Sequence, residues 1–355
     1  MAAAPHPHGR EDRTAGRRRR AAGLMGGIPA VTLVAVVAVV AIALYAIFGG
    51  ADFGGGVWDV LATGPRRKQQ QDIIGHAIGP VWETNHVWLI FMIVLLFTCF
   101  PPAFASVSIG LYVPLTFVLV GIILRGAAYA FRSQANRAVR LSQAWGHVFG
   151  IASIVSPFFF GTCVGGLTVG RFAWTSPFAL AVGGLAVALC AQLAAVFLTC
   201  EVRGPVRQDF RARGMIVTIV LAAIGALALG VAYATAPDVF AALKRPQSLP
   251  GIGVAMTFGF VVVGCLWFRR YQFARIAVCI ETVAILVGWY ASQAPYLIPG
   301  ELTYVQAAAP PETLRAFLVL VACGSVLLVP SLWLLFRVFK NEPLESHEAV
   351  PQHAS

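Results

Sequence analysis

A carboxylate, an amide, an imidazole and two indoles stand close together where a long apolar run begins. The stretch reads Gly79-Pro80-Val81-Trp82-Glu83-Thr84-Asn85-His86-Val87-Trp88-Leu89, and the run that follows ends at Phe100-Pro101-Pro102. A charged side chain inside a membrane is costly, so it is normally paired or functional. Glu83 is therefore the first candidate for chemistry, with Trp82, Asn85, His86 and Trp88 as supporting groups.

Three other charged residues lie in or beside apolar runs. Asp52 lies in the glycine-rich stretch Phe48-Gly49-Gly50-Ala51-Asp52-Phe53-Gly54-Gly55-Gly56, Arg125 closes a run, and Glu281 lies well inside another. A proton-entry path needs carboxylates that load and unload protons and a cation that holds their pKa in range. Asp52, Glu83 and Arg125 are thus the predicted path. Glu281, which needs a partner or protonation, is a supporting candidate.

Each of these residues also has a structural interpretation. Glu83 follows Pro80 and could sit in the first turn of a helix, where a negative side chain suits the helix dipole. Asp52 could be a turn residue among its glycines, and Arg125 could extend its charge to the membrane surface. His86 lies one helical turn after Glu83 and could hydrogen-bond to it or ligate a haem. The residues alone leave these alternatives open.

The composition predicts an all-α polytopic membrane protein. Of the 355 residues, 58% are hydrophobic and only 12% are charged. Apolar runs long enough to cross a hydrocarbon core of about 30 Å recur along the chain, which predicts about nine transmembrane helices in a bundle. The predicted spans are 29–48, 82–100, 104–124, 147–169, 176–199, 214–236, 251–268, 273–292 and 315–337. Only Pro101-Pro102-Ala103 separates the second span from the third, so these two helices should be antiparallel neighbours.

One membrane domain is expected over residues 28–337, between two polar ends. Residues 1–27 are basic, include Arg17-Arg18-Arg19-Arg20 and lack any core-forming pattern, which predicts a disordered arm. Residues 338–355 form a polar tail. The net charge of +11 comes from the arm and the loops, and it indicates topology signals and anionic headgroups, with no nucleic acid as partner.

Positive charges beside the spans predict the orientation in the membrane. They gather in the loops after the first, third, fifth and seventh spans and in the C-terminal tail. These parts should therefore face the cytoplasm, which leaves the N-terminus outside. The arginine-rich arm contradicts this orientation, and a translation start at Met25 would remove the conflict.

No other motif indicates a self-sufficient active site. The seven cysteines are scattered without CxxC spacing or clustering with histidines, so they predict no disulfide framework and no metal site. The sequence also lacks a P-loop, a GxSxG motif and an HExxH motif. The chain is thus expected to be a transporter or a subunit of a larger membrane enzyme.

Four patches of the sequence resemble subunit II of the cytochrome bd quinol oxidase family, including its cyanide-insensitive members. They are Gly50-Ala51-Asp52-Phe53-Gly54; Gly79 to Leu89 with Phe100-Pro101; Leu111-Tyr112-Val113-Pro114-Leu115 with Leu124-Arg125-Gly126 and Phe131-Arg132; and Gly288-Trp289 with Pro295-Tyr296-Leu297-Ile298-Pro299 and the stretch from Ala307 to Pro310. The second patch is the most specific, because it is similar to I-G-P-V-W-D-G-N-E-V-W-L. Order and spacing agree from about residue 28 to residue 337.

The resemblance implies a nine-helix subunit that binds no haem and carries no catalytic residue of its own. A homologous subunit I would hold the quinol site, two b-type haems and one d-type haem. The heterodimer, with or without a small accessory subunit, would reduce O₂ to water with electrons from quinol. It would lie in the bacterial inner membrane, in contact with lipid and quinone. Asp52, Glu83 and Arg125 match the family positions assigned to a cytoplasmic proton path.

Two other functions stand beside this one. A secondary transporter would use Asp52, Glu83 and Arg125 as an intramembrane site for substrate or protons, although no internal repeat typical of transporters is visible. A haem-carrying subunit would use His86 as the ligand.

Four positions depart from the family pattern. Gly49 stands where an aspartate is common, and Ala130 replaces the acidic residue that precedes Phe131-Arg132. Glu83 replaces an aspartate, and His86 replaces an acidic or amide residue. The predicted proton path is therefore expected to be rerouted, reduced or partly carried by water.

Overall fold

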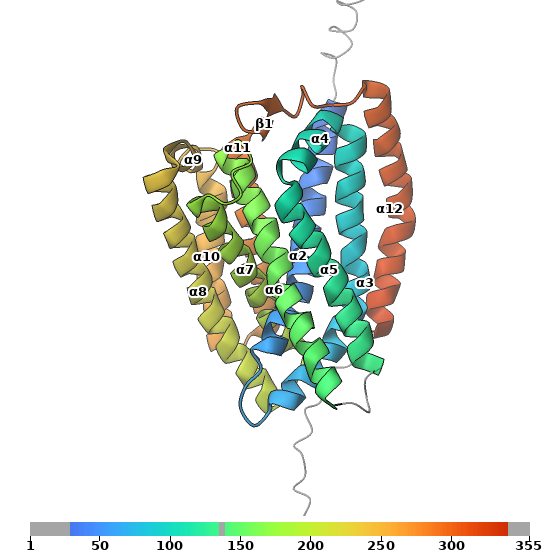
Figure 1. Ribbon diagram of the computed structural model, residues 1–355, viewed down its shortest axis with the longest axis vertical. Coiled ribbons are helices and arrows are strands. Elements are labelled where there is room, and N and C mark those ends of the chain that lie inside the picture. Colours follow the sequence, from blue (N-terminus) through green and yellow to red (C-terminus); the bar gives the residue numbers. More distant parts are fainter. Residues whose placement is uncertain (1–28, 135–138, 340–355) are drawn as a thin grey trace, which may run out of the picture.

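The computed structural model describes residues 29–134 and 139–339, without the side chains of residues 78–84, 133–134, 139–140, 332 and 335–339. The chain forms a bundle of long helices (Figure 1). The long helices are α2 (Ala30–Val60), α3 (Arg67–Cys99), α5 (Tyr112–Gln134), α6 (Val139–Val169), α7 (Pro177–Glu201), α8 (Pro205–Thr235), α10 (Leu249–Trp267), α11 (Tyr271–Gln293) and α12 (Pro311–Phe339). The short elements are helices α4 (Pro101–Gly110) and α9 (Pro237–Leu243) and the antiparallel strands β1 (Tyr296–Ile298) and β2 (Leu302–Thr303).

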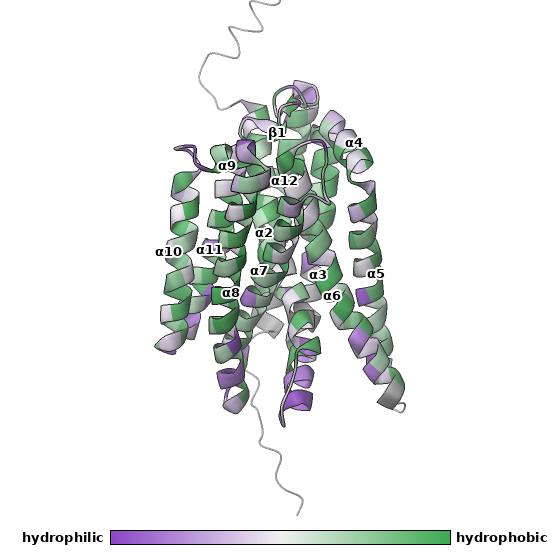
Figure 2. Ribbon diagram, turned by 60° about the vertical axis from the view of Figure 1, so that its left-hand side comes forward, coloured by the Kyte–Doolittle hydropathy of each residue, from purple (hydrophilic) through white to green (hydrophobic). Residues whose placement is uncertain are grey.

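The helices confirm the predicted all-α membrane fold. Eight of the described helices are long and apolar enough to cross a membrane, and a ninth span results if α3 and α4 count as one bent pair. Figure 2 shows apolar residues along the length of the bundle and hydrophilic residues mainly at its ends, most densely at the lower one. A helix satisfies its own backbone hydrogen bonds, which is why a chain this apolar can place so much of its backbone within lipid.

The loops sort to the two ends of the bundle because successive long helices run in opposite directions. Helices α4 and α9 and strand β1 lie at one end (Figure 1). The opposite end holds the α2–α3, α7–α8 and α10–α11 loops, which carry Arg66, Arg203, Arg269 and Arg270. We call this the arginine-rich end.

The first helix is longer than the sequence analysis predicted. Instead of stopping near residue 48, α2 continues to Val60 and includes the glycine-rich stretch and Asp52. Two of these glycines lie where α2 meets other helices: a β-carbon at Gly54 would lie 1.9 Å from the Cys190 carbonyl oxygen of α7, and one at Gly56 would lie 2.0 Å from the Ser153 hydroxyl oxygen of α6. Small residues let helix backbones approach closely in membranes. The alternative interpretation of Asp52 as a turn residue is therefore wrong.

The second and third predicted spans run in opposite directions, as expected, but they are not joined directly as two neighbouring helices of a hairpin. Helix α3 ends at Cys99, and the short helix α4 is bent from it by 119°. Proline is favoured in the first turn of a helix, so Pro101 and Pro102 begin α4 after the break. Helix α5 starts only at Tyr112 and then packs mainly against α6.

Helices α2 and α7 occupy the centre of the packing. Helix α2 packs against α3, α6 and α7, and α7 also packs against α8 and α11. Helices α10 and α11 pair with each other, whereas α12 lies at the edge against α2 and α3. The helix that carries Asp52 is thus covered by neighbours on several sides.

Candidate functional site

Asp52 and Arg125 form a doubly hydrogen-bonded ion pair inside the bundle. Arg125 Nη2 lies 2.6 Å from Asp52 Oδ1, and Arg125 Nη1 lies 2.7 Å from Asp52 Oδ2. Nη2 also donates to the main-chain carbonyl of Asp52 at 3.0 Å. The side chains of Arg125 and Asp52 are only 2% and 0% exposed, so the interpretation of Arg125 as a surface-reaching cation is wrong. Parallel hydrogen bonds of this kind hold a guanidinium and a carboxylate in one fixed geometry.

Helix α6 and two aromatic rings hold the guanidinium of Arg125 in place. Its Nε donates to Ser153 Oγ at 2.9 Å, and Ser153 in turn donates to the Phe149 carbonyl at 2.7 Å. The centre of the guanidinium lies 4.8 Å from the centroid of the Phe149 ring and 5.2 Å from that of Phe53. Cation–π contact and hydrogen bonds together compensate part of the cost of burying the charge.

Asn85 brings helix α3 to the same carboxylate. Its side-chain nitrogen donates to Asp52 Oδ2 at 3.2 Å, while its buried Oδ1 has no hydrogen-bond partner in the part of the chain that the structure describes. A β-carbon at Gly49 would lie 2.7 Å from Asn85 Oδ1. An aspartate at position 49 would therefore displace Asn85 as it lies here, which gives a steric reason for the glycine.

Glu83, the third residue of the predicted path, lies well past the first turn of α3, which begins at Arg67. The interpretation of Glu83 as a first-turn residue is therefore wrong. The side chains of Trp82 and Glu83 lie outside the described ones, so the approach of Glu83 to Asp52 and its contact with His86 stay predictions.

The remaining supporting residues of α3 lie beyond Asn85. His86 is half-buried. Trp88 packs edge-on against Phe91, with ring centroids 6.4 Å apart, and its buried indole nitrogen has no hydrogen-bond partner among the described residues. Within residues 29–134 and 139–339, no group of three or more His, Cys, Asp or Glu side chains is arranged to hold a metal ion.

A second carboxylate–guanidinium pair lies nearer the arginine-rich end, and the sequence analysis missed it. Arg132 Nη1 donates to Asp59 Oδ2 at 2.8 Å. The Asp59 side chain is 2% exposed, whereas that of Arg132 is 27% exposed. The signal was present in the spacing: Asp59 follows Asp52 by seven residues, as Arg132 follows Arg125. Seven residues are about two helical turns, so the two pairs repeat along the same faces of α2 and α5.

Glu281 lies in a separate polar cluster formed by α7, α8 and α11. Gln192 Nε2 donates to Glu281 Oε2 at 2.9 Å and to Thr218 Oγ1 at 3.1 Å. Thr218 donates to the Gly214 carbonyl at 2.7 Å. Glu281 is 5% exposed, and the described hydrogen bonds and ion pairs give it no basic partner. The structure thus gives Glu281 an amide partner that the sequence did not identify, and the hydrogen bonds described for this cluster do not involve Asp52 or Arg125.

The sequence of the chain matches a known family over nearly all of the described residues. A family model described as "Cytochrome bd terminal oxidase subunit II" matches residues 30–339. The chain belongs to this family. This membership favours a respiratory oxidase subunit over a secondary transporter.

Relatives of this subunit II chain include respiratory oxidase subunits of known name. It is 21% identical to the "Putative cytochrome bd menaquinol oxidase subunit II" of Bacillus subtilis over 84% of this chain and 92% of that protein. It is 30% identical to the "Cytochrome bd ubiquinol oxidase subunit 2" of Bacillus subtilis, but over only 32% of each chain. It is 27% identical to the "Cytochrome bd-I ubiquinol oxidase subunit 2" of Escherichia coli K12 over 52% of each. The match therefore spans about a third of the length of the Bacillus subtilis ubiquinol oxidase subunit and about half of the length of the Escherichia coli subunit.

A solved structure shares the fold of the subunit II chain. A chain of "The structure of bd oxidase from Geobacillus thermodenitrificans" superposes with a TM-score of 0.75 at 22% identity. The match covers 88% of the chain described here and 99% of the other. The family and the apolar helices together identify the subunit II chain as a bacterial membrane protein of a quinol oxidase family.

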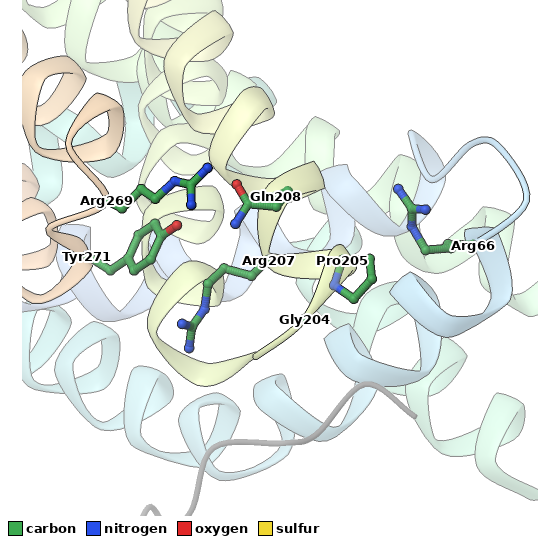
Figure 3. Close-up of a pocket in the computed structure, with 7 residues that line it drawn as sticks. All are labelled: Arg66, Gly204, Pro205, Arg207, Gln208, Arg269 and Tyr271. Carbon is green, nitrogen blue, oxygen red and sulfur yellow. The ribbon is translucent and has the colours of Figure 1, made fainter. Parts of the chain in front are cut away.

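The subunit II chain also carries a basic hollow at its arginine-rich end (Figure 3). The hollow is open to the surface, has a volume of about 630 Å³ and is lined by Arg66, Gly204, Pro205, Arg207, Gln208, Arg269 and Tyr271. Asp209 accepts a hydrogen bond from Arg66 at 2.5 Å, and this bond raises the pKa of Arg66. The Arg207 guanidinium lies 5.0 Å from the centroid of the Tyr271 ring. The positive charge of the hollow suits anionic headgroups at a membrane surface.

Proposed function

We propose that this chain is the haem-free subunit II of a bd-type quinol oxidase. It would pair with a haem-bearing subunit I, and the complex would reduce O₂ to water with electrons from quinol. The family match over residues 30–339 and the likeness to a bd oxidase chain support this assignment. The two b-type haems, the d-type haem and the quinol site belong, in this proposal, to subunit I.

The contribution of this chain would be a proton-entry path from the cytoplasm. The supporting observation is the buried Asp52–Arg125 pair, which α2 and α5 form beside Asn85 of α3. Buried charges of this kind within membrane helices mark proton and ion pathways in many membrane proteins. Glu83, two residues before Asn85 on the same helix, would be the carboxylate of α3 in this path.

The assembly is tested by purifying the complex through a tag on this chain. We expect a second membrane subunit and a reduced-minus-oxidised spectrum with b-type and d-type haem bands. A preparation with neither d-type haem nor a second subunit would defeat the proposed function. Haem that stays with this chain after the subunits are separated would instead favour the haem-carrying alternative with His86 as ligand.

The proton path is tested by Glu83→Gln in the purified complex. We expect slower quinol-dependent O₂ consumption with unchanged haem content, because the amide cannot carry a proton at neutral pH. Glu312→Gln is the matched control, since Glu312 is an exposed carboxylate in the first turn of α12. Equal turnover in the two variants would argue against a path through Glu83.

The orientation of the chain follows in this proposal from its loops. Because arginine and lysine gather on the cytoplasmic side, the arginine-rich end and the C-terminus would face the cytoplasm. This orientation is tested by fusing to the C-terminus a reporter protein that is active only in the cytoplasm. Activity of a periplasm-only reporter at the same position would contradict it.

A further inference from the structure

The two buried aspartates of α2 differ in how completely their oxygens are bound. Both oxygens of Asp52 accept from Arg125, and Oδ2 accepts from Asn85 as well. Asp59 accepts from Arg132 through Oδ2 alone, and its Oδ1 is buried without a hydrogen-bond partner among the described residues. A buried carboxylate oxygen normally has a donor, and ordered water is the usual one where protein supplies none.

This difference decides which carboxylate is suited to take up a proton. A proton reaching Asp52 would have to displace a charge-assisted bond of the Arg125 pair or the Asn85 bond, in a site where Arg125 is nearly unexposed. At Asp59, a proton can bind Oδ1 while Arg132 keeps its bond to Oδ2. Both oxygens of Asp52 are therefore occupied by protein donors, whereas Asp59 has an oxygen available for protonation.

The position of Asp59 connects it to the arginine-rich end. It lies one residue before the end of α2, and its partner Arg132 is partly exposed. Helix α3 also contacts this residue, because Gln71 Nε2 donates to the main-chain carbonyl of Asp59 at 3.0 Å. The other charged groups that act on Asp59 are Arg67 and Asp72, also on α3. The Asp59 carboxylate thus lies between solvent at this end and the fully buried Asp52.

We propose that Asp59 is the carboxylate that receives protons from the arginine-rich end and passes them inward, while Asp52 and Arg125 form a fixed pair. The inference deepens the proposed function and depends on it, because it assumes that this chain carries a proton path. In the uptake step, a hydronium ion from the arginine-rich end gives a proton to Asp59 Oδ1 and is left as water. In the release step, the same proton leaves to water on the inner side, so that the carboxylate is regenerated and no electron is transferred.

The departure at position 130 fits this role. The resemblance predicts an acidic residue just before Phe131-Arg132, and this chain has Ala130. Arg132 obtains its carboxylate instead from Asp59 on a different helix. A carboxylate and a guanidinium are therefore both present at this level of the bundle, although position 130 is alanine.

The test compares Asp59→Asn, Asp59→Glu and Asp209→Asn in the purified complex. Asp209 is the matched control because it also pairs with an arginine, Arg66, at the same end, but at the surface. We expect Asp59→Asn to lower quinol-dependent turnover by about tenfold, less than the loss typical of a general acid–base group because water can still carry protons. Haem content should stay unchanged, since the partly exposed Arg132 can turn towards water when its partner is neutral.

Two further measurements of turnover distinguish a role of Asp59 in proton transfer from a structural role. Asp59→Glu should retain most of the turnover, and a small weak acid such as formic acid should raise the turnover of Asp59→Asn severalfold. Asp209→Asn should show neither the loss nor the rescue.

Three results would overturn the inference. One is full turnover in Asp59→Asn, and another is a loss of turnover that matches a loss of haem. A third is a slow variant that no weak acid restores. In each case Glu83→Gln shows whether the proposed path itself survives: if that variant is slow with its haem retained, only the role of Asp59 has failed.

Discussion

Arg125 and Ser153 are joined by a hydrogen bond of 2.9 Å between Nε and the hydroxyl oxygen. The bond ties α5 to α6 at the level where Arg125 also binds Asp52 of α2. The Ser153 hydroxyl donates a hydrogen bond to the Phe149 carbonyl, and its oxygen accepts the bond from Arg125. A neutral side chain thus helps to set the geometry of a charged pair formed by two other helices.

Ser153→Ala should destabilise the complex without changing its haem type. The substitution leaves the buried Nε of Arg125 without its acceptor, which costs about 1–3 kcal/mol. The measurement is the temperature at which the detergent-solubilised complex loses its haem spectrum. Ser325→Ala is the control, because Ser325 is exposed on α12 and donates to the Val321 carbonyl of its own helix. Equal midpoints for the two variants would show that the Ser153 contact contributes nothing.

Gly54→Ala should prevent the normal packing of α2 on α7. The new β-carbon would lie 1.9 Å from the Cys190 carbonyl oxygen, which is backbone and cannot turn away. Gly253→Ala is the matched control, since nothing lies within 4 Å of a β-carbon there and alanine favours a helix interior by up to about 1 kcal/mol over glycine. We expect little assembled complex for the first variant and normal or higher yield for the second, measured by haem per unit of membrane protein. Normal yield of Gly54→Ala would contradict the close approach.

The sequence predicted the fold well where hydropathy determines it. Spans of about 20 apolar residues, such as the one that became α7, need only be long enough to cross the membrane, and their edges fell close to the observed helix. The glycine-rich end of α2 was misread because glycine also marks turns. In the structure these positions are helical and Gly54 and Gly56 pack closely against α7 and α6, and a single sequence does not contain these contacts.

The candidate site was predicted in part for a similar reason. Charged residues in apolar runs drew attention to Asp52 and Arg125, and their pairing depends on how α2 and α5 lie around α6. Asp59 was missed because it lies at the polar end of α2, where a carboxylate needs no explanation. Its seven-residue offset from Asp52, repeated between Arg125 and Arg132, becomes meaningful once the register of the two helices is known.

Glu281→Gln should preserve or raise the stability of the complex. Glu281 is buried, accepts from Gln192 at 2.9 Å and has no basic partner in the described structure. A glutamine at this position can still accept that bond through its amide oxygen, and it removes any cost of burying a charge. Glu281→Leu is the comparison, because it removes the acceptor of Gln192 and should cost about 1–3 kcal/mol. The thermal midpoint of the haem spectrum measures both, and a large loss in Glu281→Gln would show that an ionised Glu281 has a role here.

Replacing one member of the Asp52–Arg125 pair should destabilise the subunit more than replacing both members. Asp52→Leu leaves a nearly unexposed guanidinium without its counter-ion, and Arg125→Met leaves a buried carboxylate with only Asn85. Removing one member of a buried pair typically costs about 3–5 kcal/mol, whereas replacing both by apolar side chains is often close to neutral. We therefore expect each single variant to accumulate poorly in the membrane and the double variant to recover much of the wild-type level.

Recovery in the double variant should be incomplete, because Ser153 and Asn85 lose their partners as well. The measurement is the amount of this subunit in isolated membranes, with the haem spectrum of the purified complex as a second readout. The Asp59→Leu and Arg132→Met variants provide the matched cycle at a partly exposed pair, where coupling should be weaker because Arg132 reaches water. If the losses of Asp52→Leu and Arg125→Met simply add in the double variant, the two side chains do not depend on each other as the 2.6 Å contact requires.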